Sequence, residues 1–467
     1  MDEYASAVEI AAAIRSKEVS PLEVLDACLL RVDDRNPALN AVIWRNDDEA
    51  RAKAIALGER IASGGTEVPP FAGVPLPIKD LVPVAGQPLT YGSFGVSDQP
   101  ATETEPIVAA LIAAGFILCG RTNTPAFGAI TVTENDRYGA TRNPWSVRHS
   151  PGGSSGGGAA AVASGMFPAA HASDGGGSIR IPASCCGVVG LKPSRGRVAA
   201  TVPGWEGMAT EGALSRTVAD TAALLDVISA ADPYAWWNAP SPEQPFADEV
   251  GRDPGRLRVA LCSVSSLGLP VADEPAAAVD HAGRLLEAAG HEVWRLDADV
   301  FDPSALEPFL NVVNAGLSAP TGVDWTEVEP HIRAGYAAAG EVDSLTFTRS
   351  MAELHRFTRT VVARFDSEFD LLVTPTMTVE PPLVGLLEAV HAAAGDVVPD
   401  IMAMAAFTAV FNITGQPAVS LPLHTAASGL PVGVQIVAGP WREAQLINVA
   451  SQLELADPWT DRYPPLG

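Results

Sequence analysis

Short apolar segments alternate with alanine-rich stretches along most of this chain. Segments such as GVPLPIKDLVPVAG (73–86) and AAGFILCGRTN (113–123) are bounded by glycine or proline. RLRVALCSV (256–264) and HEVWRLDA (291–298) flank the helical stretch AAAVDHAGRLLEAAG, as a β-α-β unit requires. This alternation predicts an α/β fold whose sheet is at least partly parallel.

The chain has 467 residues, more than the length at which one hydrophobic core usually stops growing. Large α/β enzymes built on a single sheet nevertheless reach this length, and we expect one domain over residues 1–467. Capping boxes that begin at Ser6 and Ser20 predict helices within residues 1–65. Residues from about 300 to 400 have a weaker helical pattern, and we expect them to form a pocket wall or lid.

Acidic residues outnumber basic ones, 55 against 30, which gives a formal net charge of −25. Nucleic acids and anionic membranes attract clustered lysine and arginine, so we expect neither as a partner. The five cysteines are scattered without a C-x-x-C pair, which disfavours a disulfide framework and a zinc site. The first residues lack the basic and apolar regions of a signal peptide, and we expect a cytoplasmic protein.

Two clusters place serines among glycines, SPGGSSGGG (150–158) and SDGGGSIRIP (173–182). Glycine lets consecutive backbone N–H groups face one concavity, because no side chain blocks the approach. The amides before Ser178 would then surround an oxyanion that develops beside its hydroxyl. A tight turn with positive φ angles requires the same glycines. The triplet by itself therefore fits both an oxyanion-binding site and a purely structural turn.

The first cluster contains G-x-S-x-G twice, centred on Ser154 and Ser155. A nucleophile elbow of this type follows directly from a strand, whereas the preceding TRNPWSVRHSP contains two prolines and no strand pattern. No G-K-[ST] closes the glycine run, which excludes a phosphate-binding P-loop. The pattern therefore fits neither of these common motifs.

Lys79 ends the apolar run GVPLPI, where a buried strand is expected to finish. Burial lowers the pKa of a lysine, and the neutral amine is a competent general base. A lysine that extends to the surface fits the same pattern. His149 and His171 are the histidines nearest to the serine clusters, but neither stands in a motif that marks a catalytic base.

Together these segments resemble the amidase signature family of Ser–Ser–Lys hydrolases. Lys79 stands in GVPLPIKD, Ser154 in PGGSSGG and Ser178 in SDGGGSIRIPASCCGVVGLKPSRGRV, with the two serines 24 residues apart. The signature block covers residues 73–197, and the resemblance extends over nearly the whole chain. It implies a large mixed central β-sheet covered on both faces by helices, and no cofactor or metal.

The resemblance also implies roles for individual residues. Ser178 is the expected nucleophile, Ser154 relays its proton from a cis-peptide arrangement, and Lys79 is the terminal base. The expected oxyanion hole consists of the amides of Gly175, Gly176, Gly177 and Ser178. Supporting hydrogen bonds are expected from Ser155, Asp174 and Arg180. The segments that approach the substrate in the family contain Tyr91, Phe127, Ile130, Thr131, Trp205 and Phe407.

Two departures from the family pattern stand out. Ser173 and a third glycine, Gly175, occupy a segment that often reads T-D-x-G-G-S, and Ala126 stands where many members have a glutamate. We expect the missing side chain at Ala126 to widen the pocket. The N-terminal half and GVQIVAG near the C-terminus resemble the branch that contains cyclic-dimer hydrolases and aryl acylamidases.

The implied activity is hydrolysis of small-molecule amides, with broad specificity for aryl and alkyl amides. Esters and carbamates are further expected substrates, and the latter would make the protein a urethanase. We expect a monomer or homodimer. The alternative is the glutaminase subunit of a tRNA-dependent amidotransferase, although RTNTPAFG differs from the K-T-N-M-D-E-F-A-M-G form of that subunit. A non-catalytic scaffold would have lost Lys79, Ser154 or Ser178, and all three are present.

Overall fold

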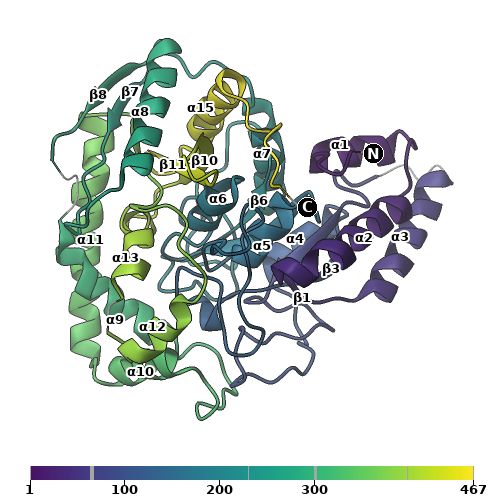
Figure 1. Ribbon diagram of the computed structural model, residues 1–467, viewed down its shortest axis with the longest axis horizontal. Helices are drawn as coiled ribbons and strands as arrows, with labels where there is room; N and C mark the ends of the chain where they lie inside the picture. Colours follow the sequence, from purple (N-terminus) through teal and green to yellow (C-terminus); the bar gives the residue numbers. More distant parts are fainter. Residues whose placement is uncertain (1, 64–67, 230, 299–301, 397, 466–467) are drawn as a thin grey trace.

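The computed structural model describes residues 2–63, 68–229, 231–298, 302–396 and 398–465, and Figure 1 shows the course of the chain. The expected segment boundaries at residues 65 and 300 lie outside these described residues. The fold is mixed α/β, as the alternation of apolar and alanine-rich segments predicts.

The strands form two sheets. They are β1 (Val42–Trp44), β2 (Pro75–Lys79), β3 (Ile117–Thr122), β4 (Ala169–Asp174), β5 (Val189–Lys192), β6 (Thr210–Ser215), β7 (Arg258–Leu261), β8 (Glu292–Arg295), β9 (Leu371–Pro375), β10 (Ala418–Thr425) and β11 (Pro431–Ala438). Among the described residues, eight strands make a central sheet in the order β4-β6-β5-β10-β11-β9-β7-β8. The smaller sheet has the order β1-β3-β2.

The central sheet is mixed. Its pairs from β4 to β9 are antiparallel, whereas β7 runs parallel to both β9 and β8. The helix between β7 and β8 makes them the predicted β-α-β unit, because parallel neighbours need a crossover connection. The prediction of a partly parallel sheet is therefore confirmed.

Helices surround the sheets. They are α1 (Ala7–Arg15), α2 (Pro21–Leu39), α3 (Asp47–Ala62), α4 (Pro106–Ala113), α5 (Gly156–Ala163), α6 (Arg180–Cys186), α7 (Val218–Ile228), α8 (Asp273–Ala288), α9 (Leu306–Gly316), α10 (Pro330–Gly340), α11 (Ser344–Ser367), α12 (Leu386–Ala393), α13 (Pro399–Ala405), α14 (Val410–Ile413) and α15 (Glu443–Ala456). The capping boxes at Ser6 and Ser20 begin α1 and α2, as predicted. Figure 1 shows α1, α2 and α3 at one side of the molecule and α11 at the opposite side.

Both faces of the central sheet are covered. In β11, Ile436 packs in a cluster with Val279 of α8 and Leu446 of α15. The next residue, Val437, points to the other face and packs with Val361 of α11. Successive side chains of a strand alternate between faces, and both faces are apolar here because each is buried under helices. Within the described residues no helix is long and apolar enough to cross a membrane.

The glycines after the first serine cluster allow α5 to pack closely. A methyl group on Gly157 would lie 2.5 Å from the backbone nitrogen of Asn123 and 2.7 Å from the carbonyl oxygen of Ala41. All eight residues of α5 are buried. The glycines of this cluster therefore bring the turn that carries Ser154 against the smaller sheet.

Candidate active site

Three segments that are far apart in the sequence meet at the candidate site. Strand β2 ends at Lys79, and the turn 150–155 leads directly into α5. Strand β4 ends at Asp174, and the glycine turn 175–178 then leads toward α6. Each segment ends, precedes or follows a buried element, so the rigid parts of the fold position the site.

The Lys79 amine lies among serine hydroxyls. Its Nζ is 2.7 Å from Oγ of Ser154, 2.9 Å from Oγ of Ser155 and 3.0 Å from Oγ of Ser173. The peptide bond between Gly153 and Ser154 is cis. The Lys79 side chain is fully buried, so these hydroxyls take the place of water around the amine.

Burial lowers the pKa of Lys79 to about 7, and the charges of Glu211 and Asp174 oppose this fall. In the described part of the chain no carboxylate forms an ion pair with the amine. A substantial fraction of the Lys79 amines is therefore neutral near pH 7. A neutral amine has a lone pair that can accept the proton of the Ser154 hydroxyl.

Ser155 ties the two serine turns together. Its N–H donates to the carbonyl oxygen of Ser178 at 3.2 Å, and its Oγ donates to the carbonyl oxygen of Ser173 at 3.2 Å. The same Oγ accepts from the N–H of Ser173 at 3.3 Å. Ser155 thus fixes the spacing between the segments that carry Ser154 and Ser178.

Asp174 and Arg180 form a buried, bidentate ion pair at the base of the glycine turn. Nε and Nη2 of Arg180 donate to the two carboxylate oxygens of Asp174 at 2.9 and 2.8 Å. Burial alone would raise the pKa of Asp174, but the charge and hydrogen bonds of Arg180 hold it below its usual range. Arg180 also donates to Oε1 of Gln435 and Oδ1 of Asn412, at 2.6 and 2.7 Å.

The Asp174 carboxylate uses one of the expected oxyanion donors. The N–H of Gly177 donates to Oδ1 of Asp174 at 2.8 Å, so this amide holds the turn in shape and is not free for a substrate oxygen. No hydrogen bond within the described residues engages the N–H groups of Gly175, Gly176 and Ser178. These three amides are the donors that remain for an oxyanion.

The third glycine makes room for an indole ring. A methyl group on Gly175 would lie 2.3 Å from Cζ3 of Trp205, and one on Gly316 of α9 would lie 2.4 Å from Cδ1 of the same ring. Trp205 is thus wedged between the glycine turn and α9, with Phe309 of α9 edge-on at 6.2 Å between ring centroids. Any side chain at position 175 would displace this ring.

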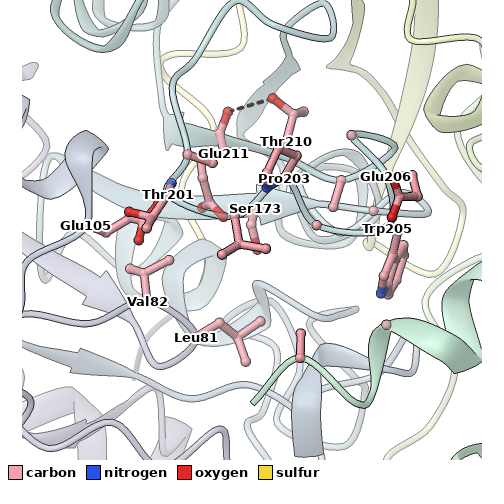
Figure 2. Close-up of a pocket in the computed structure, with 18 of the residues that line it drawn as sticks. Leu81, Val82, Glu105, Ser173, Thr201, Pro203, Trp205, Glu206, Thr210 and Glu211 are labelled. Atoms are coloured by element: carbon pink, nitrogen blue, oxygen red, sulfur yellow. Dashed lines mark hydrogen bonds between the residues drawn. The ribbon is translucent and has the colours of Figure 1, made fainter. Parts of the chain in front are cut away.

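The serines open onto a cavity of about 700 Å³ that Ser154, Ser173, Ser178 and Gly175 line. Figure 2 shows Ser173 among the lining residues, with Trp205 on another part of the wall. The segment 315–320, which includes the end of α9, also contributes to the lining. The assignment of residues from about 300 to 400 to a pocket wall or lid stays a prediction.

The expected pocket residues divide into two groups. Tyr91, Phe127 and Trp205 line the cavity, and the rings of Tyr91 and Phe127 stack with 5.6 Å between centroids. Outside its lining lie Ile130, Thr131 and Phe407. The Thr131 hydroxyl donates to the carbonyl oxygen of Ile401 at 3.2 Å, because tertiary packing turns it toward α13.

Ala126 also lies away from the cavity. It is buried in a cluster with Leu317, Val328 and Ile332, so its small side chain packs against the segment around α10. The expected widening of the pocket at this position stays a prediction.

Sequence reasoning missed several residues that organise the site. The N–H of Lys79 donates to Nδ1 of His171 at 3.3 Å, and Nε2 of His171 donates to Glu211 at 2.9 Å. These bonds make His171 a link between β2 and β6. Asn412 and Gln435 come from the C-terminal part of the chain. Gln435 stands in the quoted segment GVQIVAG, but the sequence assigned no role to either residue. Within the described chain, no group of three or more His, Cys, Asp or Glu side chains is arranged to hold a metal ion.

Comparison with known proteins agrees with this geometry. The family profile described as Amidase matches residues 23–447. The chain is 38% identical to a 6-aminohexanoate-cyclic-dimer hydrolase of Pseudomonas sp. (strain NK87), over 100% of this chain and 97% of that protein.

Two solved structures are similar over almost their full length. The structure of a 6-aminohexanoate cyclic dimer hydrolase complexed with substrate has a TM-score of 0.94 and 36% identity, and covers 100% of both chains. A bacterial aryl acylamidase of the amidase signature enzymes has a TM-score of 0.90 and 27% identity, and covers 99% of both chains. The chain matches the family profile, aligns with its relatives over almost their full length and shares their fold. It therefore belongs to the amidase signature family of amide-hydrolysing enzymes.

Proposed function

We propose that this protein hydrolyses small-molecule amides through an acyl-enzyme on Ser178. In the first step Oγ of Ser178 attacks the substrate carbonyl carbon, and its proton passes to Ser154. The Ser154 proton passes in turn to Nζ of Lys79. The observation that carries this proposal is the buried Lys79 amine 2.7 Å from Oγ of Ser154, with Ser154 and Ser178 both on the cavity wall.

The negative charge that develops on the carbonyl oxygen is stabilised by backbone N–H groups. Gly175, Gly176 and Ser178 supply these donors, while the Gly177 amide keeps the turn rigid through Asp174. Collapse of the tetrahedral intermediate returns a proton from Lys79, by way of Ser154, to the leaving nitrogen. Water then attacks the acyl-enzyme by the same route and releases the acid.

The substrate range follows from what the site contacts. The serines and amides act on the acyl carbon and its oxygen, so esters and carbamates are further substrates. The leaving group is contacted only by the cavity wall. The relative that hydrolyses a 6-aminohexanoate cyclic dimer makes cyclic amides a class to include. We place the protein in the cytoplasm, in keeping with five buried cysteines that form no disulfide with one another in the described part of the chain. We propose a monomer or homodimer.

A substrate panel with trapping of the intermediate tests this proposal. Purified protein is given a p-nitroanilide and a p-nitrophenyl ester with one common acyl group, together with an aryl carbamate and a cyclic diamide. We expect hydrolysis of the anilide and a peptide containing Ser178 that gains the acyl mass on rapid acid quenching. Ser178→Ala should remove both signals. Full turnover in that variant would show that another residue is the nucleophile.

A further inference from the structure

Carboxylates line the cavity beside Ser178 with little basic charge to oppose them. The lining carboxylates are those of Glu103, Glu105, Glu206 and Glu211. In the described part of the chain Arg195 is the one lysine or arginine of the lining. Its guanidinium already donates to three backbone carbonyl oxygens, one of Gly207 and two of α14. The cavity therefore presents an excess of negative charge.

Glu105 is the most deeply placed of these acids. It is only 9% exposed, and Thr201 is the residue of the described chain that hydrogen-bonds to its carboxylate, with its N–H at 2.7 Å. Neither a lysine nor an arginine of the described chain pairs with it. Burial and the charge of Glu211 raise the pKa of Glu105, while the hydrogen bonds of Thr201 and the charge of His171 oppose this rise. A cation entering the cavity would supply an opposite charge.

Glu211 stands on the same wall as Glu105, as Figure 2 shows. Oε2 of Glu211 accepts the His171 Nε2–H bond at 2.9 Å, and the side chain stays partly exposed. The two carboxylates are close enough for the charge of Glu211 to act on Glu105. Like charges at such a distance repel each other, and a cation bound between them removes the repulsion.

Aromatic rings complete the cavity toward solvent. Trp236 is 87% exposed and lines the cavity together with Trp237, whose ring lies edge-on at 6.2 Å. The exposed carboxylate of Glu206 is part of the same lining. Aromatic faces attract ammonium groups and also cover the methylene chain that carries them.

We propose that this cavity selects amides that carry a protonated amine several carbon atoms from the scissile bond, with the ammonium group held by the carboxylates of Glu105 and Glu211. The inference rests on the proposed amide hydrolysis and adds the charge class of its substrate. Substrates with a carboxylate in the same position meet like charge and are rejected.

Two matched substrate series test this selectivity. The first has ω-aminoheptanoyl, ω-hydroxyheptanoyl and ω-carboxyheptanoyl p-nitroanilides, which differ only in the charge of the acyl end. The second has N-acetylcadaverine and N-acetyl-aminopentanol, which carry the difference on the leaving amine. At about pH 8 the amine is protonated and the carboxyl ionised. In at least one series we expect kcat/KM to be about tenfold higher for the ammonium than for the hydroxyl substrate, and lowest for the carboxylate.

Charge-removing variants locate the selectivity. Glu105→Gln and Glu211→Gln should each lower the ratio of ammonium to hydroxyl kcat/KM several-fold, and Glu206→Gln should lower it less. Glu206 is exposed, so its variant remains informative where substitution of the buried Glu105 prevents folding. Glu287→Gln, at an exposed position of α8 outside the cavity lining, is the matched control and should leave the ratio unchanged.

The outcomes separate this inference from the proposed function. Ammonium substrates that are no better than hydroxyl substrates in both series would overturn the selectivity and leave amide hydrolysis intact. A ratio that falls equally in Glu287→Gln would also overturn it. A protein that hydrolyses no member of either series loses the proposed function, and this inference with it.

Discussion

The indole of Trp205 occupies the space that a Cβ on Gly175 would need. The nearest ring atom would lie 2.3 Å from such a methyl group, far inside van der Waals contact. The same ring leaves no room for a side chain at Gly316 of α9. The turn that carries the candidate oxyanion donors is therefore packed through one ring against a helix of the segment that forms the cavity wall.

Gly175→Ala should destabilise the fold while Gly176→Ala should not. The first substitution forces Trp205 away and should cost about 1 to 3 kcal/mol of stability, as overpacking usually does. A methyl group on Gly176 meets nothing within 4 Å, which makes it the matched control. Thermal unfolding of both variants checks this. Combining Gly175→Ala with Trp205→Ala should recover part of the loss, and strictly additive effects would contradict the packing argument.

Activity should rise with pH through an apparent pKa near 7. Lys79 must be neutral to accept a proton, and burial lowers its pKa to about 7, so the protonated and inactive form prevails at lower pH. The pH profile of kcat/KM on an uncharged anilide shows this rise as its acidic limb. Lys79→Met should lower kcat/KM about 100- to 10,000-fold and remove the limb. A limb that survives in this variant would point to another base.

Glu211→Gln should move that limb to lower pH. The negative charge of Glu211 favours the protonated Lys79 amine and opposes the lowering of its pKa by burial. Removing the charge therefore lowers the pKa of Lys79 further, and activity persists to lower pH than in the wild type. The same pH profile, measured on the same uncharged substrate, gives the direction. A shift to higher pH would contradict the assignment of Lys79 as the base.

A fluorophosphonate should label Ser178 and leave Ser154 unmodified. Ser178 follows the amides that we propose as oxyanion donors, whereas Oγ of Ser154 faces the lysine. Peptide mass spectrometry identifies the modified serine. Ser154→Ala should slow the labelling without moving it, because only the proton relay is lost. Label on Ser154 would exchange the roles of the two serines.

Asp174→Asn should destabilise the protein strongly. It leaves the fully buried Arg180 without its opposite charge, which typically costs about 3 to 5 kcal/mol. Asp98→Asn breaks an exposed ion pair with Arg137 and should cost less than about 1 kcal/mol. Chemical denaturation of both variants compares the two pairs. Similar losses would mean that the buried pair does not hold the glycine turn.

Local sequence pattern predicts the parts of this fold that short-range interactions determine. The capping boxes at Ser6 and Ser20 begin helices because side chain and backbone three residues apart satisfy each other. The β7–α8–β8 unit is likewise readable from periodicity and glycine positions. The position of β2 cannot be predicted from the local pattern. Lys79 ends a strand of the smaller sheet, and not of the central one, because β2 pairs with β3 across a long separation in sequence.

The sequence by itself determined the chemistry that is available: one lysine at a strand end, serines among glycines and an acidic chain. Only the tertiary structure decided how these groups are used. It placed the Lys79 amine within 2.7 Å of Ser154, committed the Gly177 amide to Asp174 and set Trp205 against Gly175. It also brought Asn412 onto the Arg180–Asp174 pair from the far end of the chain. The reason is physical: pKa shifts, donor availability and close packing depend on neighbours that chain folding brings together from distant positions.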